Sequence, residues 1–470
     1  MIKLYNTLSK KIEGFRPIRP GFVGMYTCGP TVYDHTHLGH MRTYVNTDLL
    51  RRMLEYNGLE VEQVENVTDV GHLLGDRDLG EDKLEMGAKR EGKSAWEIAK
   101  IYEKEFFETM EALNVKRPTV ICLATEHIKE MIDLIKLIEG KGFTYKTSDG
   151  IYFDTSKIKD YNKLSGMPLG KLKEGARIEP NPEKRNPTDF ALWKFSPKTG
   201  SKRQMEWNSP WGVGFPGWHI ECSAMGMKYL GGQFDIHTGG EDHIPIHHTN
   251  ERAQNFAVAG HEVVKFWFHN AFLLVDGGKM SKSKKNFYWL KDIEERNFEP
   301  LSLRYLFLTT HYRSKMNFTW ESLKSAQVAY KKLVELVKEW RGGGRTTVSV
   351  EDVDKINSFT EKFQDKINND LNIPEALAVV WKVAKSNIPN PDKLDLILDF
   401  DQVLGLELER VSRESRVSRV PREVKELVNK REELREQQKW AGADKIRKQI
   451  EKLGWKIEDA LQGSKVKRSN

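Results

Sequence analysis

The sequence has few cysteines and no long apolar run, and both scarcities narrow what the protein can be. Only three of its 470 residues are cysteine, namely Cys28, Cys122 and Cys222. They are too few and too scattered for a disulfide framework, so we expect free thiols, metal ligands or nucleophiles in a reducing compartment. No run of about 18 apolar residues occurs, and the N-terminus lacks a signal-peptide core. We therefore expect a cytoplasmic protein with no membrane partner.

Charge is concentrated near the end of the chain. The formal net charge is +7, and residues 406–470 carry 18 Lys and Arg against 12 Asp and Glu. A basic segment of this kind fits a polyanion such as RNA, because each neutralised phosphate releases counterions. It also fits an ordinary solvated helical face, and charge alone leaves both readings open.

The order of the predicted elements favours an α/β fold. Residues 22–28 alternate like a strand and end at Gly29-Pro30, residues 41–58 read as an amphipathic helix, and residues 61–70 read as a second strand. This order predicts a doubly wound, Rossmann-like parallel sheet. We also expect a helix over about 96–142, irregular chain with short strands over 144–210, and one strand over 267–277. From about residue 301 through 463 we expect helices, interrupted by a loop at 341–347 and a linker at 411–421.

Two motifs fit nucleotide chemistry. His37, Gly39 and His40 follow the first strand and open a helix, whose N-terminus favours anions, and Gly39 leaves a bare surface for a flat ring. A loop at 279–283 offers basic and hydroxyl groups that can close over a triphosphate; it contains Lys279, Met280, Ser281, Lys282 and Ser283. Taken alone, the histidine motif could arise by chance, and the 279–283 motif could be an exposed, lysine-rich turn. Together they resemble the signature pair of class I aminoacyl-tRNA synthetases.

Four scattered residues form a candidate metal shell. Cys28 ends the first strand, Cys222 lies where a loop enters a helix, and His247 and Glu251 are four apart on one helix. Such ligands can meet at the end of a parallel sheet and would suit zinc. On composition alone, buried apolar cysteines are the better interpretation.

The motifs together resemble cysteinyl-tRNA synthetases. The matching segments are 27–40, 66–72, 124–128, 214–225, 234–251 and 279–283, with a further match in the tail. The resemblance implies that Cys28, Cys222, His247 and Glu251 hold one Zn²⁺, with His248 in another role. It also implies ATP with Mg²⁺, L-cysteine and tRNA(Cys) as partners, and a monomer. The family often has two aspartates where this chain has Gly71-His72, which weakens any role for those positions.

The same resemblance assigns further residues and regions. His37, His40, Lys279 and Lys282 would be catalytic, and Asp242 would join them at ATP. Gly29, Thr68 and Trp218 would bind the amino acid. In the C-terminal helices, the tRNA-reading positions would be Arg435, Trp440, Asp444, Arg447 and Asp459. The expected regions are 1–110 and 206–275 (catalytic halves), 111–205 (connective insert), 276–320 (signature loop and stem contact), 321–405 (helical bundle) and 406–470 (anticodon-binding domain).

Two alternatives remain. One is a related ligase that gives activated cysteine to an aminosugar; such enzymes lack the tRNA-reading end that this chain resembles. The other is a non-enzymatic RNA-binding protein, against which the intact histidines and lysines of both motifs argue.

Overall fold

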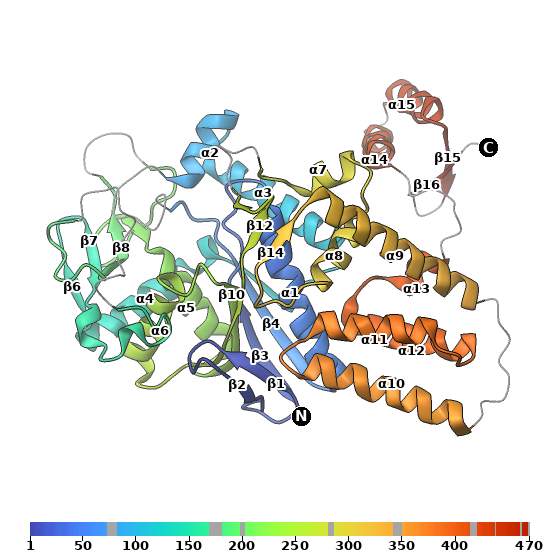
Figure 1. Ribbon diagram of the computed structural model, residues 1–470. Helices are drawn as coiled ribbons and strands as arrows, with labels where there is room; N and C mark the ends of the chain where they lie inside the picture. Colours follow the sequence, from blue (N-terminus) through green and yellow to red (C-terminus); the bar gives the residue numbers. More distant parts are fainter. Residues whose placement is uncertain are drawn as a thin grey trace. The chain divides into compact units, whose positions relative to one another are not determined.

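A computed structural model of the chain describes residues 1–72, 82–168, 181–197, 203–280, 286–341, 350–413, 421–437, 439–460 and 463–468 (Figure 1). The chain forms two compact units, Met1–Glu407 and Leu408–Asn470. None of the helices in these residues is both long and apolar enough to cross a bilayer.

A five-stranded parallel sheet forms the centre of the first unit, which confirms the predicted fold class. Its strand order is β11-β10-β3-β4-β5. The chain builds β4 and β5 on one side of β3, and later places β10 and β11 on the other side. The carboxyl ends of β3 and β10 therefore flank the point where the strand order reverses, which is where α/β sheets bind ligands. The bounds are β3 (Phe22–Thr27), β4 (Glu60–Val67), β5 (Val120–Leu123), β10 (Phe234–Gly240) and β11 (Val264–Asn270).

Helix α1 (Leu38–Tyr56) connects β3 with β4 and is unusually polar for a buried helix. Its side chain Asp48 accepts hydrogen bonds from Arg52 at 2.7 Å and Arg304 at 2.6 Å. Arg304 is fully buried, and it also donates to the carbonyls of Leu113 and Leu404. This network fixes α1 against α8 (Pro300–Leu308) and α12 (Asn390–Leu404).

An antiparallel insert interrupts the parallel sheet. Its strand order is β6-β7-β8-β9, and it packs beside the helices that follow β5 and β9. These elements are α4 (Ile128–Gly140), β6 (Thr144–Lys146), β7 (Gly150–Phe153), β8 (Phe190–Phe195), β9 (Gly214–Pro216) and α5 (Trp218–Leu230). The hairpin of β1 (Lys3–Asn6) and β2 (Lys11–Gly14), α2 (Lys83–Glu91), α3 (Ala95–Ala112) and α6 (His247–Ala259) complete this half.

A second, three-stranded sheet carries the start of the 279–283 motif. Strand β12 (Leu273–Val275) pairs antiparallel with β13 (Gly278–Lys279) and parallel with β14 (Met316–Phe318). Helices follow for the rest of this unit: α7 (Leu290–Glu295), α9 (Trp320–Trp340), α10 (Val350–Asn368) and α11 (Ile373–Lys385), besides α8 and α12. The predicted loop at 341–347 lies, from residue 342, outside the described residues.

Two of the expected elements were wrong. The predicted helix over 96–142 is broken by β5, because a four-residue apolar run is too short for its periodicity to distinguish strand from helix. The strand expected over 267–277 divides at Ala271 and Phe272 into β11 and β12, which belong to different sheets. Arg42 of α1 binds the carbonyls of both dividing residues.

The second unit also ends differently from the expectation of helices to residue 463. It contains α13 (Leu408–Arg413), α14 (Arg422–Glu436) and α15 (Trp440–Lys452), then a hairpin of β15 (Trp455–Ala460) and β16 (Gly463–Arg468). Gly454 at φ 80° ends the helix, since this conformation favours glycine. The side chains of Trp455 and Ile457, at alternate positions of β15, are then buried against α14 and α15. Most of the predicted linker at 411–421 lies outside the described residues.

The Arg304 network predicts a large stability effect. Replacing Arg304 with alanine would leave Asp48 charged, buried and short of a partner, so we expect Arg304→Ala to lower the free energy of unfolding by about 3–5 kcal/mol. The matched control is Lys129→Ala, which removes an exposed ion pair to Asp133 and should change the free energy of unfolding far less, because exposed ion pairs contribute little. Denaturation of both variants measures the difference; equal losses would contradict the structural role of Arg304.

Candidate active site and metal centre

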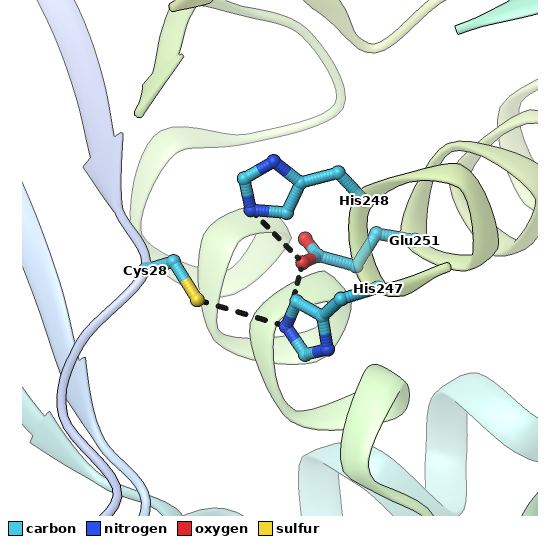
Figure 2. Close-up of side chains that lie close together, drawn as sticks. All are labelled: Cys28, His247, His248 and Glu251. Carbon is cyan, nitrogen blue, oxygen red and sulfur yellow. Dashed lines mark hydrogen bonds and ion pairs between the residues drawn. The ribbon is translucent and has the colours of Figure 1, made fainter. Parts of the chain in front are cut away.

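Four potential metal ligands gather between β3 and α6. One ligand atom from each of Cys28, His247, His248 and Glu251 lies within 4.8 Å of all the others (Figure 2). His247 Nε2 is 3.6 Å from Cys28 Sγ and 3.0 Å from Glu251 Oε1, and His248 Nε2 is 3.8 Å from the same oxygen. Cys28 follows β3 directly, and the other three occupy the first five positions of α6. The turn of the helix therefore presents all three to the strand end.

Cys222 of α5 reaches the same centre. Its Sγ lies 3.7 Å from His247 Nε2, the atom that also faces Cys28. The four residues predicted as ligands are thus brought together, although His248 rather than Cys222 belongs to the tightest group. Both Cys222 and His248 therefore lie where a fourth metal ligand could be.

Further imidazoles surround these ligands and orient them. His219 Nδ1 lies 3.0 Å from His247 Nδ1, which leaves His247 Nε2 facing the thiols. His237 Nε2 lies 2.7 Å from Glu251 Oε2, so Glu251 Oε1 faces the centre. His248 Nδ1 contacts His269 Nε2 at 2.8 Å. Contacts of this kind fix ring orientation around metal ligands.

Charge within the cluster is distributed unevenly. A hydrogen bond from Cys222 lowers the pKa of the Cys28 thiol well below its usual range, with help from nearby imidazoles and against burial. The same hydrogen bond and burial raise the pKa of Cys222. Burial opposes ionisation of Glu251, but His237 and His247 outweigh it and lower its pKa. A thiolate and a carboxylate thus face one small buried volume, which is chemistry suited to a cation.

A second set of polar groups adjoins the metal ligands. Gly29 N donates to Asn66 Oδ1 at 2.8 Å, and a side chain at Gly29 would overlap the Asn66 carbonyl. Thr68 Oγ1 donates to Glu221 Oε2 at 2.8 Å, and Glu221 also contacts His72. Trp218 stands over His247 with ring centroids 4.7 Å apart. The three residues predicted to bind the amino acid therefore lie next to the predicted ligands or their contacts.

The N-terminus of α1 carries the nucleotide motif. His37 is the N-cap, and its Nδ1 accepts hydrogen bonds from Gly39 N and His40 N. These two N–H groups are therefore already paired within the motif. The His37 and His40 rings stack, with their ring centroids 3.6 Å apart. The His40 side chain keeps an exposed face, and desolvation by the groups around it lowers its pKa, opposed by the charge of Asp242.

The second motif approaches the same helix. Gly39 faces the methyl group of Met280, because a β-carbon placed on Gly39 would lie only 2.9 Å from it. Tyr288, after the motif, accepts a hydrogen bond from Leu38 N at 3.1 Å. Ser281, Lys282 and Ser283 lie outside the described residues, as does the side chain of Lys279.

The chain is similar in sequence to known enzymes. A family model for the class I (C) tRNA synthetase catalytic domain matches residues 14–328. Cysteine–tRNA ligase 1 of Burkholderia lata is 50% identical over 467 residues, which cover 99% of this chain and 96% of that protein. The chain belongs to the cysteine–tRNA ligase family. The cysteine–tRNA ligases of Treponema denticola (42%; 97% and 98% covered) and Thermococcus onnurineus (40%; 99% of each covered) are similar over the same extent.

Solved structures of other synthetases share the fold of this cysteine–tRNA ligase family member. A Mycobacterium tuberculosis methionyl-tRNA synthetase with methionyl-adenylate gives a TM-score of 0.57 at 15% identity, over 83% of this chain and 90% of that one. An Agrobacterium radiobacter leucyl-tRNA synthetase in a ternary complex gives 0.62 at 12% identity, over 84% and 85%. At such identities the likeness concerns the fold alone.

In the second unit, the ligase carries the predicted tRNA-reading residues on neighbouring elements. Arg435, near the end of α14, lies 5.6 Å over the ring of Trp440, which begins α15 and is 57% exposed. Asp444 and Arg447 follow at helical spacing on α15, and Arg447 pairs with Glu451. Asp459 belongs to β15, and its side chain is outside the described residues.

Sequence reasoning missed the imidazoles that hold the ligands in place. His219, His237 and His269 come from α5, β10 and β11, and none of them belongs to a metal-binding spacing. A signal was available in the local density of histidine, since residues 237–248 include four histidines. That density predicts a polar cluster but not which nitrogen faces which partner.

We expect His219 to control metal affinity without touching the metal. His219→Phe keeps a flat ring but removes the partner of His247 Nδ1, and loss of such a contact typically weakens metal binding by about 10–100-fold. Competition with a chromophoric chelator measures the change. His261→Phe, which alters an exposed histidine elsewhere, should leave the affinity unchanged. Equal affinity in wild type and His219→Phe would exclude this orienting role.

Proposed function

We propose that this chain activates L-cysteine with ATP, releases pyrophosphate, and transfers the cysteine to the 3′ end of tRNA(Cys). One observation carries the proposal beyond family membership. The thiol-containing metal cluster and the histidine-capped helix α1 begin at the same strand end, since Cys28 and His37 are only nine residues apart and both follow β3. An amino acid held at the cluster therefore has its carboxylate within reach of a nucleotide on α1.

The cluster suits one Zn²⁺. Zinc bonds of about 2.3 Å to sulfur and about 2.0 Å to imidazole nitrogen, at a tetrahedral angle, separate the two atoms by about 3.5 Å. Cys28 and Cys222 lie 3.6 and 3.7 Å from His247 Nε2. We therefore favour Cys28, Cys222, His247 and Glu251 as ligands, with His248 beside them, held by His269.

The substrate thiol provides the basis of selection. Serine and cysteine differ by one atom, and pocket shape separates such isosteres poorly. Bound zinc would supply a soft partner for a thiolate but a much poorer one for a hydroxyl. Trp218, Thr68 and Gly29 would hold the rest of the amino acid, because they surround the same centre.

Activation needs positioning more than proton transfer. The cysteine carboxylate is already ionised at neutral pH, so it attacks the α-phosphate without a general base. His37 and His40 would bind phosphate oxygens of ATP with its Mg²⁺, and the charge of Asp242 acts on His40. Lys279 and Lys282 would neutralise charge that develops on the departing pyrophosphate.

The C-terminal unit supports tRNA as the acceptor in preference to an aminosugar. Curated cysteine–tRNA ligases match this chain along nearly its whole length, including this unit. Trp440 with Arg435 offers a stacking surface for an unpaired base, a common mode of RNA recognition.

Replacing one cysteine tests the selection mechanism. Cys28→Ser should lower zinc affinity by more than about 100-fold, because mutating a residue that only hydrogen-bonds to a metal ligand already lowers affinity by about 10–100-fold. It should also impair cysteine binding more than ATP binding. The matched control is Cys122→Ser, because Cys122 is equally buried but bonds the Glu65 carbonyl. Zinc content and cysteine-dependent ATP–pyrophosphate exchange, run against serine, give the answer. Normal zinc content and a normal cysteine KM in Cys28→Ser would refute the assignment; no exchange in wild type would refute the function.

Removing the second unit separates activation from transfer. A chain ending at Glu407 should retain cysteine-dependent exchange within a few-fold, because the metal cluster and α1 lie in the first unit. Its aminoacylation of tRNA should fall by at least about 100-fold, as expected when an RNA-reading module is lost. Parallel loss of both activities would count against a separate RNA-reading unit.

A further inference from the structure

Arg42 is a buried arginine whose guanidinium contacts only backbone carbonyls within the described residues. It lies in the first turn and a half of α1, two residues after His40, and is 1% exposed. Nη1 donates to the carbonyls of Ala271 at 2.6 Å and Phe272 at 3.2 Å. Nη2 donates to the carbonyls of His311 at 3.1 Å and Ser314 at 2.7 Å. Burial lowers its pKa to about 10, so it stays charged at neutral pH.

The four carbonyls belong to two segments that enter the three-stranded sheet. Ala271 and Phe272 lie immediately before β12, and His311 and Ser314 lie shortly before β14. Strand β12 turns through Asp276 and Gly277 into β13, which ends at Lys279. One guanidinium thus joins the helix bearing His37 and His40 to the base of the sheet bearing Lys279.

Other contacts show that this joint is built into the active site. Glu241, the neighbour of Asp242, accepts a hydrogen bond from Phe272 N at 2.8 Å. Arg42 and Glu241 therefore both bind the same peptide segment, where β11 ends and β12 begins. At the other end of the sheet, Met280 reaches Gly39 of α1.

We propose that Arg42 is a positioning residue for cysteine activation: it sets the three-stranded sheet, and with it the backbone of Lys279 at the end of β13, at the correct distance from the histidine motif on α1. The inference rests on the proposed function. Five N–H donors in a rigid plane allow one arginine to bind four carbonyls of two segments, whereas a lysine ammonium has three donors on one atom. A displacement of about 1 Å in such an arrangement can cost about 10²-fold in rate.

The test compares Arg42→Lys with Arg52→Lys. Arg52 lies on the same helix, is 8% exposed, and also donates to carbonyls, but those belong to Asn114 and Gln402, away from the three-stranded sheet. Thermal midpoint, zinc content, cysteine affinity and single-turnover adenylate formation are measured for both variants and wild type. Wild-type exchange in the same assay establishes the proposed function separately.

We expect Arg42→Lys to slow adenylate formation by about 10²-fold, with zinc content and cysteine affinity unchanged and any loss of midpoint matched by Arg52→Lys. Arg52→Lys should form adenylate within about threefold of wild type. A normal rate in Arg42→Lys would overturn the inference, as would equal slowing in both variants.

A second variant covers the case in which Arg42→Lys does not fold. Glu241→Ala releases Phe272 N, which belongs to the same peptide segment that Arg42 binds. Slower adenylate formation with normal zinc content and cysteine affinity would support the inference. An unchanged rate in Glu241→Ala would overturn it.

Discussion

The parallel pairing of β3 with β10 is the contact on which the rest of the site depends. Cys28 N donates to the Thr238 carbonyl at 3.1 Å, which extends the ladder into the first residue of the site. Beyond this point the chain leaves β3 for α1 and leaves β10 for α6. Because parallel strands end at the same edge, the thiol, the histidine-capped helix and the ligand-bearing helix meet without any long loop.

Burying so many polar groups at this edge has a cost that the surrounding residues offset. An unpaired buried carboxylate or imidazole is expensive, so each hydrogen-bond partner around the ligands reduces the cost of burying them. His247 is held by His219, Glu251 by His237, and His248 by His269, which in turn contacts Thr7 at 2.8 Å. The fold thereby fixes the direction of each ligand atom before any cation binds, which lowers the ordering cost of binding.

Much of this could be predicted from the sequence, for identifiable reasons. The alternation in β3 and the helix after His40 predicted the sheet correctly. The structure brings the four residues that the resemblance named as ligands close together, with His248 in the tightest group. The features that could not be predicted depend on contacts between residues far apart in the sequence. Nothing near Arg42 in the sequence indicates that it binds carbonyls more than 200 residues away, and the break between β11 and β12 depends on those bonds. Likewise, the four residues of β5 form a strand because they pair with β4, whereas their own periodicity does not distinguish a strand from a helix.

The proposed selection of cysteine requires the substrate sulfur to join a metal already held by two thiolates of this chain. X-ray absorption at the zinc edge counts sulfur neighbours directly, on the full-length protein with and without amino acid. We expect two sulfur neighbours in the free protein, from Cys28 and Cys222, a third when cysteine binds, and no change with serine. An unchanged sulfur count on adding saturating cysteine would contradict it.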